Sequence, residues 1–294
     1  MSNASKAQEH LTLPPLLSGL SEISARYDYF IFDVWGVLHD GLRLYPGTVP
    51  TLKALREQGK HIALLSNTPS LGKDIKADLD LMGLSPALYD FIVTAGDSTR
   101  AELETRQGQS CWLAAHMERY DSLLDDLDIA FHDHYNGVDF VLNAMGSTFE
   151  ASDTWIEKAL NDCLEAGLPM ICANPDLVVG VGGRTHKCAG TYALYYEERG
   201  GSVTYHGKPH GPVYERVHML FGHPDKAKII AIGDSFHTDI TGANNFGIAS
   251  ILNLVGIHYE ETLCPKGGHM DETLVTEMLT RQSARPDYIL GGLT

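Results

Sequence analysis

The sequence predicts an α/β protein built on a doubly wound parallel sheet. Short apolar runs of strand length alternate with longer segments whose apolar residues recur at helical spacing. Three of the apolar runs also end in polar side chains, at Asp33, at Ser66 with Asn67, and at Asp234. Ligands bind at the carboxyl ends of the strands in open parallel sheets, so this placement fits the same fold.

The first third of the chain alternates regularly between the two kinds of element. In order, we expect a short helix within residues 15–26, a strand at 29–33, a helix at 48–58, a strand at 62–66, a helix at 70–82, a strand at 91–94 and a helix at 97–105. The apolar residues of the helix expected at 48–58 recur at helical spacing, and Gly59 ends that helix. Such an order is typical of a sheet covered by helices.

A polar break at residues 106–109 marks the first domain boundary. The following segment has its own expected elements, with strands at 138–143 and 169–172 and a helix at 154–166. We therefore expect an inserted α/β domain at 107–201. The core would be formed by residues 1–106 and 202–294, with further strands that end at Asp234 and at residue 254.

Asp33 is the centre of the candidate site. It ends an apolar strand, and Gly36 follows in a turn whose backbone N–H groups can face an anion. Taken alone, Ser66 with Asn67 is more typical of a turn, and Lys208 is more typical of a solvated surface lysine. Found together and in order with Asp234, these residues favour a functional site instead.

The segments around Asp33, Ser66, Lys208 and Asp234 resemble, in content and order, the haloacid dehalogenase (HAD) superfamily of aspartyl-phosphate-forming hydrolases. Asn174-Pro175-Asp176 resembles the cap of the class IIA, NagD-like sugar phosphatase branch. The resemblance spans about residues 29–290. It implies a Rossmann-like core with an inserted cap that selects the substrate.

Phosphate monoesters resist hydrolysis because their anionic oxygens repel nucleophiles, so an enzyme must neutralise that charge and align the attack. A carboxylate nucleophile divides the reaction into two displacements, and we assign this role to Asp33. Ser66 can donate a hydrogen bond to a phosphoryl oxygen, and Lys208 can place a positive charge beside it. Asn67 is expected to position the nucleophile or the substrate.

A hard cation with oxygen ligands suits this set of carboxylates, and Mg²⁺ meets that description. The resemblance implies that Asp33, Asp234 and the main-chain carbonyl of Trp35 bind the metal directly. It places Asp239 further out, or bound to the metal through water.

The sequence departs from the family pattern at Trp35. Phosphatases of the family carry an Asp there, which protonates the leaving group and then activates water. His39, Asp40 or His186 could replace it, or the leaving group needs no acid. Haloacid dehalogenases, which work without Mg²⁺, have an aromatic residue at this position, but the Asp234 and Asp239 pair argues against that activity.

Substrate contacts are expected from the cap and from the turn after Asp33. Gly36 can offer a backbone N–H group, and Asp176 is a contact by resemblance. The glycine-rich stretch 180–190 brings Arg184, which can bind an acidic group, and His186. A glycine-rich turn that enters a helix explains this stretch equally well.

Composition limits the partners. The net charge of −16 disfavours nucleic acid and anionic membranes. No apolar run is long enough to cross a bilayer, no signal peptide is recognised in residues 1–24, and the five cysteines form no CxxC pair. We therefore expect a cytoplasmic, Mg²⁺-dependent phosphatase for a small phosphomonoester such as a sugar phosphate, with a cap-mediated homodimer. The alternative is a protein that binds a phosphorylated metabolite and turns it over poorly.

Overall fold

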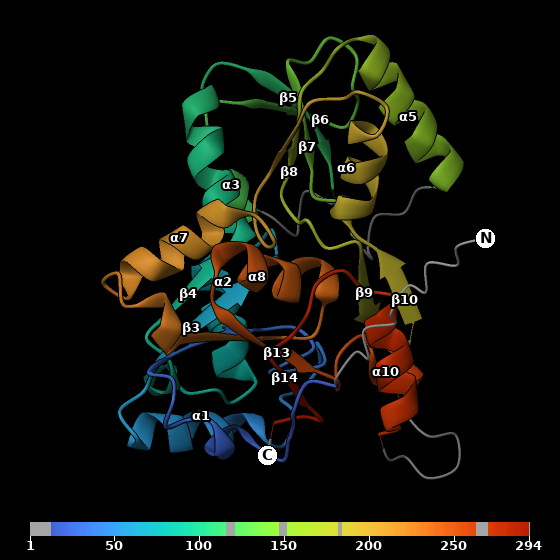
Figure 1. Cartoon of the computed structure of the whole chain (residues 1–294). Helices are drawn as coiled ribbons and strands as arrows, with labels where there is room; N and C mark the ends of the chain where they lie inside the picture. The colour runs from blue at the N-terminus through green and yellow to red at the C-terminus, as the bar shows by residue number, and fades with distance from the viewer. Residues whose placement is uncertain (1–12, 116–120, 147–151, 182–183, 263–269, 294) are drawn as a thin grey trace, which may run out of the picture.

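The computed structural model describes residues 13–293 except 116–120, 147–151, 182–183 and 263–269, and it leaves out the side chains of residues 180, 181, 184 and 185. It contains two parallel sheets, one above the other in Figure 1, each covered by helices. The predicted fold class, a doubly wound α/β core with an inserted α/β segment, is confirmed.

The larger sheet has seven strands, all parallel. Their order across the sheet is β1 (Leu16–Leu17), β14 (Tyr288–Leu290), β13 (Ala249–Asn253), β12 (Ile229–Gly233), β2 (Tyr29–Asp33), β3 (His61–Ser66) and β4 (Phe91–Thr94). The helices of this layer are α1 (Thr48–Glu57), α2 (Gly72–Leu81), α3 (Ala95–Leu103), α7 (Gly211–Leu220), α8 (Thr241–Phe246), α9 (Tyr259–Thr262) and α10 (Glu272–Thr280).

Alternation along β2 explains why both faces of this sheet are covered. Phe30 and Phe32 face one side and pack with apolar residues of α1 and α2. Ile31 faces the other side and packs with residues of α7 and α8. Successive strand side chains point to opposite faces, so a strand that is apolar throughout must be buried on both.

The smaller sheet has five parallel strands and sits above the carboxyl ends of the larger one. Its order is β11 (Val203–Tyr205), β8 (Met170–Cys172), β7 (Phe140–Asn143), β5 (Ser110–Ala114) and β6 (Ala130–His132). Its helices are α4 (Asp121–Leu124), α5 (Asp153–Glu165) and α6 (Ala189–Glu197). We call residues 110–205 the cap and the remainder the core.

A two-stranded antiparallel hairpin, β9 (Val178–Val181) and β10 (Arg184–Lys187), extends from the cap. In Figure 1 it runs down from the smaller sheet towards α10 of the core. Asp176 lies two residues before the hairpin, and its hydrogen bond from Asn67 of the core places it where the cap meets the core.

Three expectations need correction. Residues 15–26 do not form a helix; Leu16–Leu17 pairs with β14, and only the short 3-10 turn Leu20–Glu22 follows. The helix expected from residue 97 begins at Ala95, because Thr94 and Asp97 form a reciprocal capping box. Residues 203–205, expected in the core, form β11 of the cap sheet, since they pair with β8.

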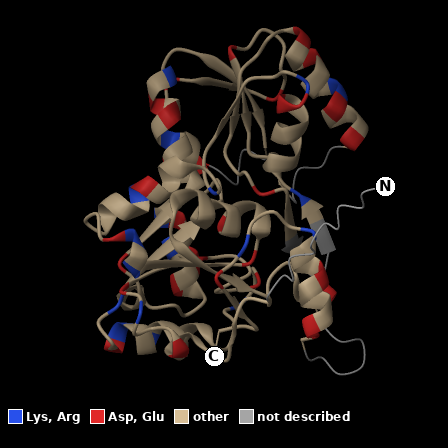
Figure 2. Ribbon diagram, viewed as in Figure 1, with Lys and Arg blue, Asp and Glu red and all other residues tan. Residues whose placement is uncertain are grey.

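Acidic and basic positions are interspersed along the chain in Figure 2. Acidic positions occur on helices of both layers, for example along α5 and α10, with Lys and Arg positions scattered between them. None of the helices in the described part of the chain has the length and apolarity needed to span a bilayer.

Candidate active site

Three neighbouring strands of the core end at one place. β12, β2 and β3 are adjacent in the sheet, and their carboxyl ends bring together Asp234, Asp33 and Ser66. These residues line a cavity of about 300 Å³ whose other wall comes from the cap. These side chains lie close together because the strands are parallel, which places all three carboxyl ends on one edge of the sheet.

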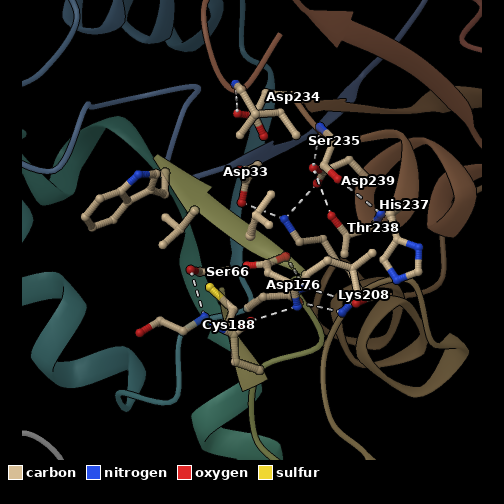
Figure 3. Close-up of a pocket in the computed structure, with 18 of the residues that line it drawn as sticks. Asp33, Ser66, Asp176, Cys188, Lys208, Asp234, Ser235, His237, Thr238 and Asp239 are labelled. Atoms are coloured by element: carbon tan, nitrogen blue, oxygen red, sulfur yellow. Dashed lines mark hydrogen bonds and ion pairs between the residues drawn. The ribbon is translucent and has the colours of Figure 1, made fainter. Parts of the chain in front are cut away.

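Lys208 lies at the centre of the charged cluster, on the segment that returns from the cap to the core. Its side chain is 3% exposed, and its Nζ donates to Oδ1 of Asp33 at 2.5 Å and to Oδ1 of Asp239 at 2.7 Å (Figure 3). Burial works to lower the pKa of Lys208, but Asp239 and Asp33 outweigh it and raise that pKa. The ammonium therefore stays charged between the two carboxyl groups.

Asn67 fixes the backbone of Lys208. Its Oδ1 accepts from the Lys208 N–H at 2.7 Å, and its Nδ2 donates to the Lys208 carbonyl at 3.0 Å. The same Nδ2 donates to Oδ1 of Asp176, from the cap, at 2.9 Å. One buried amide at the end of β3 thus ties the lysine and the cap carboxyl to the core sheet.

Three buried carboxyl groups form a cluster fit for a cation. Asp33, Asp234 and Asp239 each offer an oxygen, and these oxygens lie within 4.8 Å of one another. Burial, reinforced by the neighbouring carboxylates, raises the pKa of Asp33 to about 7 and that of Asp234 well above its usual range. A buried oxygen-only donor set with this excess of negative charge matches what Mg²⁺ and Ca²⁺ prefer.

The backbone closes tightly around Asp234. The Ile257 N–H donates to its Oδ2 at 2.9 Å. Gly36 and Gly256 pack so closely that a Cβ at either position would overlap the carboxylate. Gly36 also has φ of +83°, which glycine adopts without strain. Gly36, expected to contact substrate, instead supports Asp234 and is not among the residues that line the cavity.

Ser66 and Trp35 both line the cavity. The Ser66 hydroxyl oxygen accepts from the Thr68 N–H at 3.3 Å, so its proton remains available to a bound oxygen. The Trp35 ring lies edge-on to His39 with centroids 5.3 Å apart. A Cβ on Gly41 would come within 2.5 Å of that ring. Trp35 is therefore packed on the turn that follows β2.

None of the three replacements expected for the missing acid lies in the cavity wall. His39 is buried under Trp35, and its Nδ1 accepts from the Gly41 N–H at 2.9 Å. The Asp40 carboxylate accepts from the N–H groups of Leu42 and Arg43, which lower its pKa. His186 pairs in the hairpin with Val179.

Of the other cap residues, some line the cavity and some do not. Asp176 lines the cavity, as does the apolar set Met145, Leu177, Val178 and Val179. Arg184 lies in β10, but its side chain is outside the described part of the structure. Lys187 is not at the site, since its Nζ pairs with Asp153 at 2.7 Å on the surface.

Sequence reasoning missed the wall formed by Ile257 and His258, which line the cavity beside Phe236, His237 and Thr238. The sequence did contain an indication of this wall, because residues 249–254 were expected to form a strand of the core. Residues just after such a strand must reach the same edge as Asp33 and Asp234.

Two family models match the sequence. One, described as haloacid dehalogenase-like hydrolase, matches residues 30–130, and the other, described as HAD-hydrolase-like, matches residues 205–293. Between them they leave out only the middle of the chain, which is most of the cap, and the N-terminal segment. Apart from β1 and the first residue of β2, they contain all the strands described for the larger sheet.

Three known proteins are similar over most of their length. A haloacid dehalogenase-like hydrolase from Brucella suis 1330 is 29% identical, with 96% of this chain and all of that chain covered and a TM-score of 0.78. A 4-nitrophenylphosphatase structure from Thermotoga maritima is 25% identical, with 92% and 96% covered and a TM-score of 0.68. A 4-nitrophenylphosphatase of Schizosaccharomyces pombe is 23% identical, with 88% of this chain and 94% of that protein covered.

Proposed function

Because the chain belongs to the haloacid dehalogenase-like hydrolases, we propose that it is a phosphatase that hydrolyses small phosphomonoesters in the cavity above Asp33, with Mg²⁺ bound there. The observation that carries the proposal is the buried cluster of Asp33, Asp234 and Asp239 with Lys208 between two of its members. Such a cluster holds a cation and an ammonium at the point where a phosphoryl group must be neutralised.

Asp33 is the nucleophile in this proposal. It ends the central strand β2, lines the cavity, and is held by Lys208 at 2.5 Å. Its attack on phosphorus would form an aspartyl-phosphate and release the alcohol, and water would then release phosphate. Ser66 and Lys208 contact the phosphoryl oxygens, and Asn67 keeps Lys208 in place through both of its backbone hydrogen bonds.

Asp33, Asp234 and Asp239 would hold the cation, and the main-chain carbonyl of Trp35 is a further proposed ligand. When bound, the cation neutralises phosphoryl oxygens and orients the ester for attack. Backbone N–H groups hold two of these carboxylates in position. The Ile257 N–H donates to Asp234, and the Ser235 N–H donates to Asp239 at 3.2 Å. Ligands fixed by such outer hydrogen bonds keep their geometry.

The cavity suits a small monoester, such as a sugar phosphate. Its volume of about 300 Å³ is at the lower end for ligand sites. Lys208 is the only Lys or Arg among the described residues that line it, which fits an ester with a single phosphate group. Met145, Leu177 and Ile257 provide apolar contact for the remainder of the ester.

The direct test is phosphate release from a panel of monoesters with and without Mg²⁺. We expect release that requires Mg²⁺ and that falls to background in Asp33→Asn. Asp28→Asn is the matched control, because Asp28 lies just before the opposite end of β2, does not line the cavity, and pairs with Lys60 at 3.0 Å. Equal release by Asp33→Asn and wild type would refute the assigned site.

The same panel of esters also tests whether the protein binds phosphorylated metabolites without hydrolysing them. If wild type releases nothing from any ester but Trp35→Asp does, the chain binds phosphorylated metabolites without turning them over. Trp35 is the observation that makes this test necessary, since its ring can neither donate nor accept the proton of the reaction.

A further inference from the structure

The cap carries one carboxyl group that reaches the reaction cavity. Asp176 follows β8, lines the cavity with Asp33 and Lys208, and is only partly buried. In Figure 3 it lies on the opposite side of Asp33 from Asp234. Among the described residues, it is the only acidic side chain in the cavity wall besides the three of the cation cluster.

Asp176 is held in place from both domains. Its Oδ1 accepts from Asn67 Nδ2 at 2.9 Å, and its backbone N–H donates to Asn174 Oδ1 at 2.9 Å. Gly190 at the start of α6 packs on the backbone of Pro175 and Asp176, where a Cβ would overlap them. The carboxyl group is thus fixed relative to Lys208, because Asn67 also binds the Lys208 backbone.

The direction of the reaction puts the leaving group on the side of the cap. The nucleophile is at the end of a core strand, and in phosphoryl transfer the leaving oxygen departs roughly in line, opposite to the attacking oxygen. The cap lies above the core sheet in Figure 1, and it supplies Asp176, Leu177 and Val178 to the lining of the cavity. A carboxylate next to the phosphoryl oxygens would be repelled, whereas a protonated carboxyl can donate to them.

We propose that Asp176 is the catalytic acid and base that replaces the aspartate absent at Trp35; this inference rests on the proposed phosphatase function. In the first step Asp33 bonds to phosphorus, the bond from phosphorus to the ester oxygen breaks, and the proton of Asp176 moves to that oxygen to give the alcohol. In the second step water bonds to phosphorus, its proton moves to Asp176, and the bond to Asp33 breaks to release phosphate.

The environment of Asp176 agrees with this role. Burial raises the pKa of its carboxyl to about 6, although Lys208 and the hydrogen bond from Asn67 act in the other direction. An acid–base group works best when its pKa is near the operating pH. The cavity also contains His258, but its Nε2 is shielded from solvent, and its Nδ1 faces Glu261 at 3.5 Å.

The test compares two esters in Asp176→Asn. This variant keeps an oxygen that can accept from Asn67, so the contact between cap and core is retained while the proton is lost. One ester is 4-nitrophenyl phosphate, whose leaving group departs as a stable anion without a proton. The other is an alkyl phosphate of similar size, whose alkoxide needs one. The first-turnover rate of each is measured by rapid quench with Mg²⁺ present.

We expect Asp176→Asn to hydrolyse the alkyl ester about 10²–10⁴-fold more slowly than wild type, the usual contribution of an acid. The fold-loss for the alkyl ester should be at least about ten times the fold-loss for the nitrophenyl ester. Equal falls for both esters would show that Asp176 only positions substrate, and no fall for the alkyl ester would show that it has no part. Either result overturns the inference. Asp153→Asn, an exposed aspartate of the same cap, is the matched control and should change neither rate.

The wild type separates this test from that of the proposed function. If wild type hydrolyses neither ester, the phosphatase proposal itself fails. If wild type hydrolyses both and Asp176→Asn lowers the two rates equally, only the role of Asp176 is wrong.

Discussion

At the scale of single residues, the decisive side chain is Lys208. Its ammonium lies between Asp33 and Asp239, where its side chain is nearly inaccessible to solvent. A buried charge is tolerated only when it is paired and hydrogen-bonded. Lys208 compensates two core carboxylates, and in the proposed phosphatase it also presents positive charge to the bound phosphoryl group.

Lys208→Met tests both functions. We expect phosphatase activity to fall at least about 10²-fold, because charge stabilisation at the phosphoryl group is lost. In metal-free buffer at alkaline pH the free energy of unfolding should fall by about 3–5 kcal/mol, the usual cost of removing one partner of a buried ion pair. Urea unfolding in the presence of a chelator measures this.

Lys187→Met is the matched control for that measurement. Lys187 also pairs with an aspartate, Asp153, but both side chains are about half exposed. An exposed pair contributes at most about 1 kcal/mol. Similar losses of stability in the two variants would contradict the assignment of Lys208 to a buried, structurally necessary pair.

At the scale of elements, the turn after β2 arranges the site. Gly36 takes a positive φ and packs directly on the carboxylate of Asp234, which follows β12. Asn253, at the end of β13, donates to the Gly36 carbonyl at 3.1 Å. Three neighbouring strands therefore fix one turn, and that turn limits where the Asp234 oxygens can lie.

Gly36→Ala should displace Asp234 and weaken Mg²⁺ binding about 10–100-fold, the usual effect of disturbing the support of a metal ligand. Gly59→Ala separates this from backbone strain, because Gly59 also has a positive φ but has no atom within 4 Å of an added Cβ. Both variants should lose about 1–2 kcal/mol of stability from the left-handed conformation. Calorimetric titration with Mg²⁺ distinguishes them, and equal Mg²⁺ affinities would contradict the steric argument.

At the scale of the whole molecule, folding is coupled to the charge of the cluster. Without a cation, burial raises the pKa of Asp33 to about 7, against about 3.9 in an unfolded chain. The folded state then binds protons more tightly than the unfolded state between these values. The stability contributed by this group is complete below about pH 4 and is lost as the pH rises through about 7.

Thermal unfolding with a chelator or with saturating Mg²⁺ tests this coupling at about pH 6 and about pH 8. We expect the melting temperature with the chelator to be lower at the higher pH. Mg²⁺ should raise the melting temperature at both pH values. The increase should be larger at about pH 8, because at about pH 6 the cation must displace a proton from the carboxyl cluster. In Asp33→Asn, the increase in melting temperature from Mg²⁺ should differ less between the two pH values. An increment from Mg²⁺ that is the same at both pH values would contradict the argument.

Polar contacts join the cap and the core, among them those of Arg100 with the Leu123 carbonyl and of Ser122 with Asp74. Asn67 of the core bonds to Asp176 of the cap and to Lys208 on the segment that returns from the cap. The cavity has walls from both parts. The whole molecule, rather than either sheet alone, therefore forms the proposed site.

The sequence by itself determined the fold class and the location of the main candidate residues. Apolar runs and helical spacing report burial, which is a local property of each segment. Parallel strands then force their carboxyl ends to one edge, so the sequence alone predicts that Asp33, Ser66, Asn67 and Asp234 lie together. The structure brings them together as expected.

Only the tertiary structure decided which long-range partners each element takes. Leu16–Leu17 became a strand because β14, at the other end of the chain, pairs with it, and β11 joined the cap because β8 does. The contacts of Asn67 with Asp176 and of Gly36 with Asp234 join residues that are distant in sequence. Local periodicity shows which residues are buried, but it does not show against what they are buried, and that choice is fixed by packing of the complete chain.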